Sequence, residues 1–217
     1  MSSSRAVLPA AWLQALLLVA TCFVCYLPGL FSTPPIDRDE ARFAQASRQM
    51  LESAVLPQTL QDPALHAGGL AVPMVQDKPR LNKPPLIYWA QSASAYIFTG
   101  ANAHRDAIWM YRIPSVIGAI AAVLAVWWMG RRMFDPRAAL LAGVLLATCT
   151  AVVFDAHQAR SDQLLLGLTT WSMALLWNIL RRAKALKPVG WWRWALLWIV
   201  VGLGVLTKGL TPMVVLL

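Results

Sequence analysis

Long apolar runs restrict what this chain can fold into more than any other feature of its sequence. Residues 6–36 contain no charged side chain, and residues 8–31 form their apolar core. An α-helix rises about 1.5 Å per residue, so roughly 20 apolar residues cross a hydrocarbon layer about 30 Å thick. The sequence therefore predicts an all-α, polytopic membrane protein. Four further complete spans are expected at residues 113–130, 138–154, 163–180 and 191–207, with part of a sixth at residues 209–217.

The composition indicates the same class of protein. Apolar residues make up 58% of the 217 residues and charged residues only 13%, whereas ordinary soluble domains contain about 25% charged residues. The net charge of +9 does not indicate a nucleic-acid partner, because the basic residues cluster beside the apolar runs. Cys22, Cys25 and Cys149 all lie inside apolar runs, so we interpret them as packing residues and not as a redox pair.

The basic connections between the apolar runs predict their orientation. Residues 131–137 and 181–187 are rich in Lys and Arg and should face the cytoplasm. Both connections reach that side only if residues 86–98 do not cross the membrane, and this segment is too short to cross it. We therefore expect residues 86–98 to form an interfacial helix along the outer surface.

This topology divides the chain into three regions. Residues 1–31 are expected to form an uncleaved signal anchor, with Arg5 in the cytoplasm. Residues 32–112 then form a first periplasmic loop with interfacial helices, and residues 113–217 form transmembrane helices 2 to 6. The last apolar run is short for a span, so we interpret the chain as an N-terminal fragment.

Residues 32–83 form a polar insertion that contains six of the ten acidic residues. Within it, residues 39–56 have the period of an amphipathic helix, and Asp37 and Glu40 are spaced as a capping box. Residues 58–80 contain Pro and Gly without a clear period, which predicts a loop. One helix face should carry Phe43, Ser47, Met50 and Ala54, and another face Gln45, Arg48, Gln49 and Glu52.

Four short motifs resemble a known family of membrane enzymes. They are RDEARFA at residues 38–44, KPPLIYW at residues 83–89, RSD at residues 160–162 and TKG at residues 207–209. In this order they resemble polyprenyl-phosphate-sugar-dependent glycosyltransferases of the GT-C fold, particularly aminoarabinose (lipid A) transferases and protein-O-mannosyltransferases. The resemblance implies a GT-C-like N-terminal transmembrane core with interfacial helices in the first periplasmic loop.

The resemblance also implies roles for charged residues in these motifs. It makes Asp39 the candidate catalytic base and places Asp162 at the same site. Lysines at the positions of Lys83 and Lys208 would contact the substrate or the phosphate of its lipid carrier. The further candidate substrate contacts are Glu40, Arg42, Tyr88 and Arg160.

The acidic candidates also have a purely structural interpretation. Asp39, Glu40 and Asp162 stand at predicted helix starts, where a negative charge stabilises the helix. The acids around His157 match no strong metal-ligand spacing, so we expect no metal ion and no cofactor.

The basic and aromatic candidates have structural alternatives as well. Lys83 and Lys208 can extend their side chains to the membrane interface, as lysines at helix ends commonly do. Tyr88 fits the aromatic belt found at membrane–water interfaces.

The resemblance implies transfer of a sugar from a polyprenyl-phosphate carrier to a lipid A, glycan or protein acceptor. The expected location is the periplasmic face of a bacterial inner membrane, with membrane lipids as the other partners. Two alternatives remain open at this point: a non-catalytic subunit that binds or transports polyprenyl phosphate, and an inactive truncated product.

Overall fold

The computed structural model describes residues 10–100 and 102–216, and the predicted cytoplasmic start around Arg5 lies outside them. Within these residues the chain is helical apart from connections and one small hairpin. The helices are α1 (Ala11–Tyr26), α2 (Arg38–Val55), α3 (Leu86–Thr99), α4 (Ile108–Met133), α5 (Pro136–Ala147), α6 (Thr150–Ala156), α7 (Asp162–Lys184), α8 (Trp191–Lys208) and α9 (Thr211–Leu216); the hairpin is β1 (Met74–Val75) with β2 (Lys78–Pro79), and two 3-10 turns cover Gln58–Leu60 and Ala103–Arg105.

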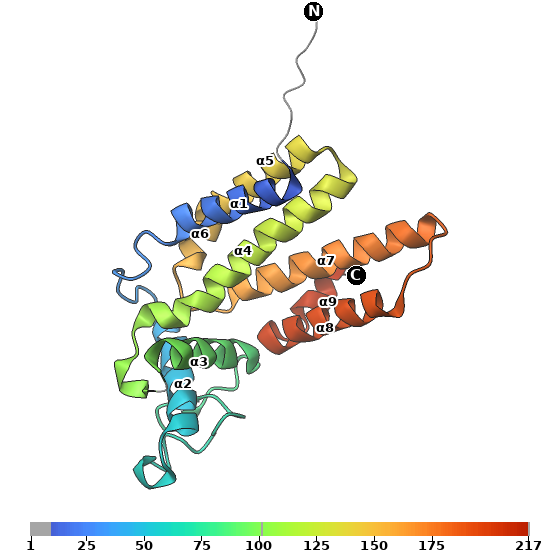
Figure 1. The fold of residues 1–217 in the computed structure, drawn as a ribbon. Coiled ribbons are helices and arrows are strands. Elements are labelled where there is room, and N and C mark those ends of the chain that lie inside the picture. Colours follow the sequence, from blue (N-terminus) through green and yellow to red (C-terminus); the bar gives the residue numbers. More distant parts are fainter. Residues whose placement is uncertain (1–9, 101, 217) are drawn as a thin grey trace, which may run out of the picture.

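The long helices form a bundle with a smaller polar region at one end (Figure 1). Helix α4 runs through the bundle and packs against α7, α5 and α1. Helix α8 packs against the opposite side of α7. The polar region contains α2, α3 and the loop between them, and it lies against the start of α4, while the α4–α5 and α7–α8 connections lie away from it. The predicted all-α fold is confirmed.

Every predicted apolar run contains a helix, but the helices differ in length. Among the described residues, α4 and α7 are long and apolar enough to cross a membrane, and α1 is apolar but shorter. Helix α8, over the predicted span of residues 191–207, is not among the helices that meet both criteria. The single span predicted over residues 138–154 is wrong in detail, because the structure breaks it into α5 and α6 with a bend of 54°. At the break, the backbone N–H and the hydroxyl of Thr148 both donate to the carbonyl oxygen of Val144, each at 2.9 Å.

Two glycines allow α4 and α7 to approach each other closely. A Cβ atom added at Gly118 would lie 2.3 Å from the carbonyl oxygen of Gln163. A Cβ atom added at Gly167 would lie 2.6 Å from the carbonyl oxygen of Gly118. Because both obstacles are backbone atoms, no rotamer change can relieve either contact. The bundle therefore depends on the absence of side chains at these positions.

Hydrogen bonds explain the polar residues inside the apolar helix α3. Ser47 of α2 donates to the Gln91 side chain at 2.7 Å, and Ser92 donates to the carbonyl oxygen of Ser47 at 2.7 Å. Ser94 donates to the carbonyl oxygen of Met110 in α4, also at 2.7 Å. These bonds join α2, α3 and α4 where the polar region meets the bundle. The predicted helix over residues 86–98 is confirmed, whereas its position along a membrane surface stays a prediction.

The amphipathic helix predicted over residues 39–56 is confirmed as α2, with one correction. Gln49 was expected on the polar face but is 2% exposed, because the following loop folds over it. Its side-chain amide donates to the carbonyl oxygens of Leu65 and Gln76, each at 2.9 Å. Its side-chain oxygen accepts from the backbone N–H of Gln76 at 2.8 Å. A single glutamine therefore holds two distant points of the loop.

A buried ion pair joins the polar region to the bundle. Arg112 of α4 and Glu40 of α2 are both fully buried, and Arg112 Nε donates to Glu40 Oε1 at 2.7 Å. The other guanidinium nitrogens of Arg112 donate to the carbonyl oxygens of Leu30, Thr33 and Pro34. Glu40 also accepts from the backbone N–H groups of Ala159 and Ile36. Four segments of the chain therefore meet at one pair of opposite charges.

Replacing Gly118 by Ala should destabilise the bundle by about 1–3 kcal/mol, the usual cost of overpacking a tight interior. The matched control is Gly202→Ala in α8, where an added Cβ atom meets nothing within 4 Å. The measurement is thermal unfolding of both purified variants in the same detergent. Equal unfolding temperatures for the two variants would contradict the close α4–α7 contact.

Replacing Arg112 by Met should lower the free energy of unfolding by about 3–5 kcal/mol, because Glu40 would keep a buried charge without its partner. Glu40→Gln should also destabilise the protein, and the double variant should lose less than the sum of the two. The control is Arg105→Met, at an exposed position. Additive losses in chemical unfolding experiments would show that the pair does not act as a unit.

Candidate functional site

Charged side chains from several distant segments gather where the polar region meets the bundle. We call this set the charged cluster and define it as Asp37, Asp39, Arg80, Arg160, Asp162 and Lys208. These residues come from the start of α2, the loop before α3, the start of α7 and the end of α8. Acidic and basic groups alternate in the cluster, so each charge has an opposite charge beside it.

One half of the charged cluster connects α2 to the end of α8. Arg160 lies 3.4 Å from Asp37 Oδ2 and 3.7 Å from Asp162 Oδ2. Asp162 in turn contacts the ammonium group of Lys208. The side chain of Asp162 is 29% exposed and that of Lys208 is 33% exposed. The structure therefore brings together three of the predicted site residues: Arg160, Asp162 and Lys208.

The other half of the charged cluster surrounds Asp39. Its carboxylate lies 3.7 Å from Arg80 Nη2 and 3.8 Å from Arg42 Nη1, and the side chain is 48% exposed. The backbone N–H of Asp39 donates to Asp37 Oδ1 at 3.2 Å, and this bond links the two halves of the cluster. Asp37 is the N-cap of α2, as its spacing predicted. Asp39 is thus held at a helix start but remains open to solvent.

Arg80 also fixes the ring of Tyr88. Its Nε donates to the Tyr88 hydroxyl at 3.0 Å, and its guanidinium lies over the Phe43 ring at 4.8 Å from the centroid. Phe43 and Tyr88 stack with centroids 5.4 Å apart. Burial raises the pKa of the Tyr88 phenol, and the positive charge of Arg80 offsets part of that effect. The phenol is fully buried, so it supports Arg80 and has no surface for a sugar.

Two predicted contacts lie apart from the charged cluster. Glu40 is fully buried against Arg112, so its carboxylate faces the protein interior and has no access to solvent. Its spacing suggested a capping box with Asp37, but Glu40 instead accepts from the N–H of Ile36. Lys83 is partly exposed, and it forms no ion pair with any residue that the structure describes.

Sequence reasoning missed Arg80 and Arg112. Arg80 lies in the predicted loop, where nothing in the spacing distinguishes it from its basic neighbours. Arg112 directly precedes the predicted span of residues 113–130, at the end of the predicted periplasmic loop. The available signal was a lone arginine at the edge of a long apolar run, because ionisable residues within such helices usually have a specific partner.

No group of three or more His, Cys, Asp or Glu side chains in the described part of the chain is arranged to hold a metal ion. The ring nitrogens of His157 lie 2.7 Å from the carbonyl oxygen of Val153 and 2.8 Å from that of Pro28. His157 therefore ties the end of α6 to the segment after α1.

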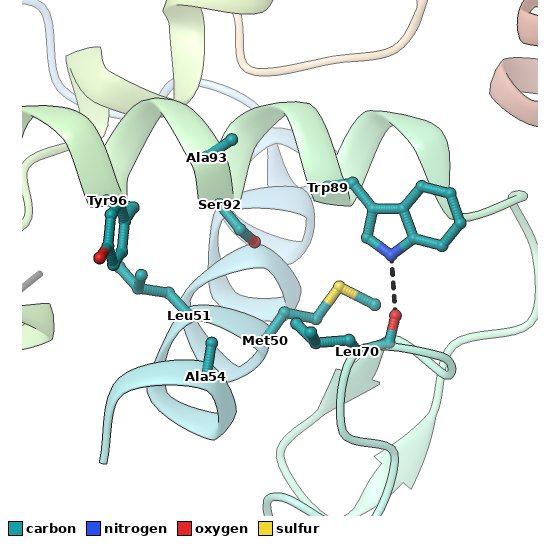
Figure 2. A pocket seen from close by; sticks show the side chains of 8 residues that line it. All are labelled: Met50, Leu51, Ala54, Leu70, Trp89, Ser92, Ala93 and Tyr96. Carbon is teal, nitrogen blue, oxygen red and sulfur yellow. Dashed lines mark hydrogen bonds between the residues drawn. The ribbon is translucent and has the colours of Figure 1, made fainter.

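An apolar pocket of about 570 Å³ lies between α2, α3 and the loop that joins them (Figure 2). Trp89 closes one side, and its indole N–H donates to the carbonyl oxygen of Leu70 at 2.7 Å. None of the predicted site residues lines this pocket. Its lining suits hydrocarbon better than a sugar and consists of Met50, Leu51, Ala54, Leu70, Trp89, Ser92, Ala93 and Tyr96.

Two bacterial transferases with the same name are similar in sequence to this chain. An undecaprenyl phosphate-alpha-4-amino-4-deoxy-L-arabinose arabinosyl transferase of Erwinia tasmaniensis is 29% identical over 82% of this chain and 28% of the relative. One of Pseudomonas aeruginosa is 28% identical over 83% of this chain and 30% of the relative. The chain thus spans about three tenths of the length of these relatives.

The fold is similar to the crystal structure of ArnT from Cupriavidus metallidurans in the apo state. The TM-score is 0.70 at 21% sequence identity, over 94% of this chain and 34% of that one. A family model described as dolichyl-phosphate-mannose-protein mannosyltransferase matches residues 82–217, a stretch that includes Lys83, Arg160, Asp162 and Lys208. Because this match covers more than half of the sequence, the chain belongs to the dolichyl-phosphate-mannose-protein mannosyltransferase family.

Proposed function

We propose that this protein transfers a sugar from a polyprenyl-phosphate carrier to a lipid A, glycan or protein acceptor at the periplasmic face of a bacterial inner membrane. The observation that carries the proposal is the charged cluster, in which the half-exposed Asp39 and the contacting pair Asp162 and Lys208 are joined through Asp37 and Arg160. Two similar proteins are named as transferases of a sugar from undecaprenyl phosphate, which supports this choice of donor class.

Asp39 is our candidate for the general base. In the proposed reaction an acceptor oxygen bonds to the sugar's anomeric carbon while its proton passes to the Asp39 carboxylate. The bond from that carbon to the carrier phosphate breaks, and the electron pair stays on the phosphate. A base must lie within hydrogen-bond reach of the proton it removes. The exposure of Asp39 supports this role, because an acceptor can approach its carboxylate.

Lys83 and Lys208 are our candidates for binding the carrier phosphate. The negative charge of that group grows as the sugar leaves, so a fixed ammonium group stabilises the transition state more than the ground state. Lys208 is held by Asp162, which we propose as a positioning residue for the lysine. Arg42, which is paired with Asp39, and Arg160, which is paired with Asp37 and Asp162, are secondary candidates for the same role.

The remaining predicted contacts are assigned supporting roles in this proposal. Glu40 positions the start of α2 through its bonds to Arg112, and Tyr88 positions Arg80 beside Asp39. The apolar pocket between α2 and α3 suits a hydrocarbon chain of a lipid-linked substrate. The three regions expected along the chain, with residues 32–112 as the periplasmic loop, stay part of the proposal.

Replacing Asp39 by Asn should abolish sugar transfer while the protein still accumulates in membranes and still binds the donor lipid. The change keeps the side-chain shape, and the helix loses only about 0.3–1 kcal/mol of charge stabilisation at its start. The measurement is transfer from radiolabelled undecaprenyl-phosphate sugars by isolated membranes. The control is Asp77→Asn, at an exposed position of the same region. Undiminished transfer by the Asp39 variant would leave the carboxylate with a helix-stabilising role alone.

Cysteine labelling in intact cells should place the two ends of the bundle on opposite sides of the membrane. We expect Asn102→Cys to react with an impermeant maleimide from the periplasm and Ala183→Cys to react only after cell disruption, because both positions are exposed. The background requires replacement of Cys22, Cys25 and Cys149. Labelling of Ala183→Cys from the periplasm would invert the proposed topology.

A further inference from the structure

The end of the bundle away from the charged cluster contains a second pocket, of about 440 Å³. It lies between the end of α4, the end of α7 and the start of α8. We call it the basic pocket and define it by six of its lining residues. These are Arg132, Arg181 and Arg193 together with Trp128, Trp171 and Trp192.

The arginines of the basic pocket are stacked on tryptophan rings. The Arg132 guanidinium lies 3.7 Å from the centroid of Trp128, and that of Arg193 lies 4.2 Å from the centroid of Trp192. Trp128 also contacts Trp171, with centroids 5.7 Å apart. Stacking holds each planar guanidinium by its face and leaves N–H groups along its edge for an acceptor.

The positive charge of the basic pocket is not neutralised by the protein. Within residues 10–100 and 102–216, no carboxylate forms an ion pair with Arg132, Arg181 or Arg193. Arg132 and Arg181 each donate one side-chain hydrogen bond, to the carbonyl oxygens of Trp128 and Arg132 respectively. A guanidinium has five N–H donors, so most of the donors in this pocket remain for a ligand.

The orientation of the helices in the membrane does not explain why the three arginines converge on one pocket. Basic residues anywhere in a short cytoplasmic connection satisfy the positive-inside rule, yet these three arginines come from three helices and converge on one cavity. The charged cluster differs in kind, because each of its bases is paired with an acid. Three arginines without acidic partners, between aromatic rings at a membrane interface, match the chemistry of an anionic lipid headgroup.

We propose that the basic pocket binds the phosphodiester headgroup of an anionic membrane phospholipid, with the glycerol portion between the tryptophan rings. The guanidinium edges donate to the phosphate oxygens, and the acyl chains remain in the bilayer beside α4 and α8. This site is independent of the proposed sugar transfer, because it lies at the other end of the bundle and shares no residue with the charged cluster.

The test measures lipid retention by the purified protein with native mass spectrometry. Dioleoyl phosphatidylglycerol and dioleoyl phosphatidylcholine are compared at equal concentration, so that only the headgroup differs. Wild-type protein should retain phosphatidylglycerol preferentially. Arg132→Gln and Arg193→Gln should each weaken that retention about fivefold, as expected for one basic residue near an anionic lipid. Equal retention of the two lipids by wild-type protein would overturn the proposal.

Three controls separate this site from general charge effects. Lys184→Gln removes a charge at an exposed position of the same end that does not line the pocket, so its retention should match wild type. Arg193→Lys keeps the charge and should retain more lipid than Arg193→Gln, while unfolding temperatures without lipid verify that each variant is folded. A loss of phosphatidylglycerol retention in Lys184→Gln equal to that in Arg193→Gln would also overturn the proposal. So would full displacement of the bound lipid when inorganic phosphate is added to wild-type protein.

Discussion

The ion pair between Arg112 and Glu40 is the interaction on which the arrangement of the site depends. A fully buried pair of opposite charges loses its hydration on folding, and it is tolerated only where further hydrogen bonds satisfy the remaining donors and acceptors. Here the backbone of the segment after α1 accepts from Arg112, and the backbone before α7 donates to Glu40. The pair therefore sets where α2 begins relative to α4 and α7, and the positions of Asp39 and Asp162 follow from it.

Charge is distributed unequally between the two ends of the bundle. At the polar region, acids and bases from separate segments alternate, so carboxylates lie beside the guanidinium groups of Arg80 and Arg160 and the ammonium group of Lys208. At the opposite end, arginines stack on tryptophans and lack acidic partners among the described residues. We propose the first arrangement for a reaction that transfers a proton and releases a phosphate group. We propose the second for binding a lipid headgroup whose negative charge does not change.

The sequence predicted the helices well, because apolar runs and an amphipathic period leave few alternatives. It did not predict the break between α5 and α6, since the run of residues 145–152 continues through the break without a Pro, a Gly or a charged residue. Motifs identified Asp39, Asp162 and Lys208 as candidates for one site. They could not show that Glu40 is buried or that Arg112 is its partner, because residues 72 positions apart meet only through tertiary packing.

Gln49 shows how a segment with little regular structure is kept in place. The loop that follows α2 has only the 3-10 turn Gln58–Leu60 and a hairpin of two short strands as regular structure. Side chains of α2 and α3 supply much of its attachment. Segments attached by few contacts unfold locally at a lower free-energy cost than the core of a protein. Arg80 lies at the end of this loop and contacts Asp39. Local opening of this loop would change the surroundings of the candidate base and leave the packing of α4 against α7 intact.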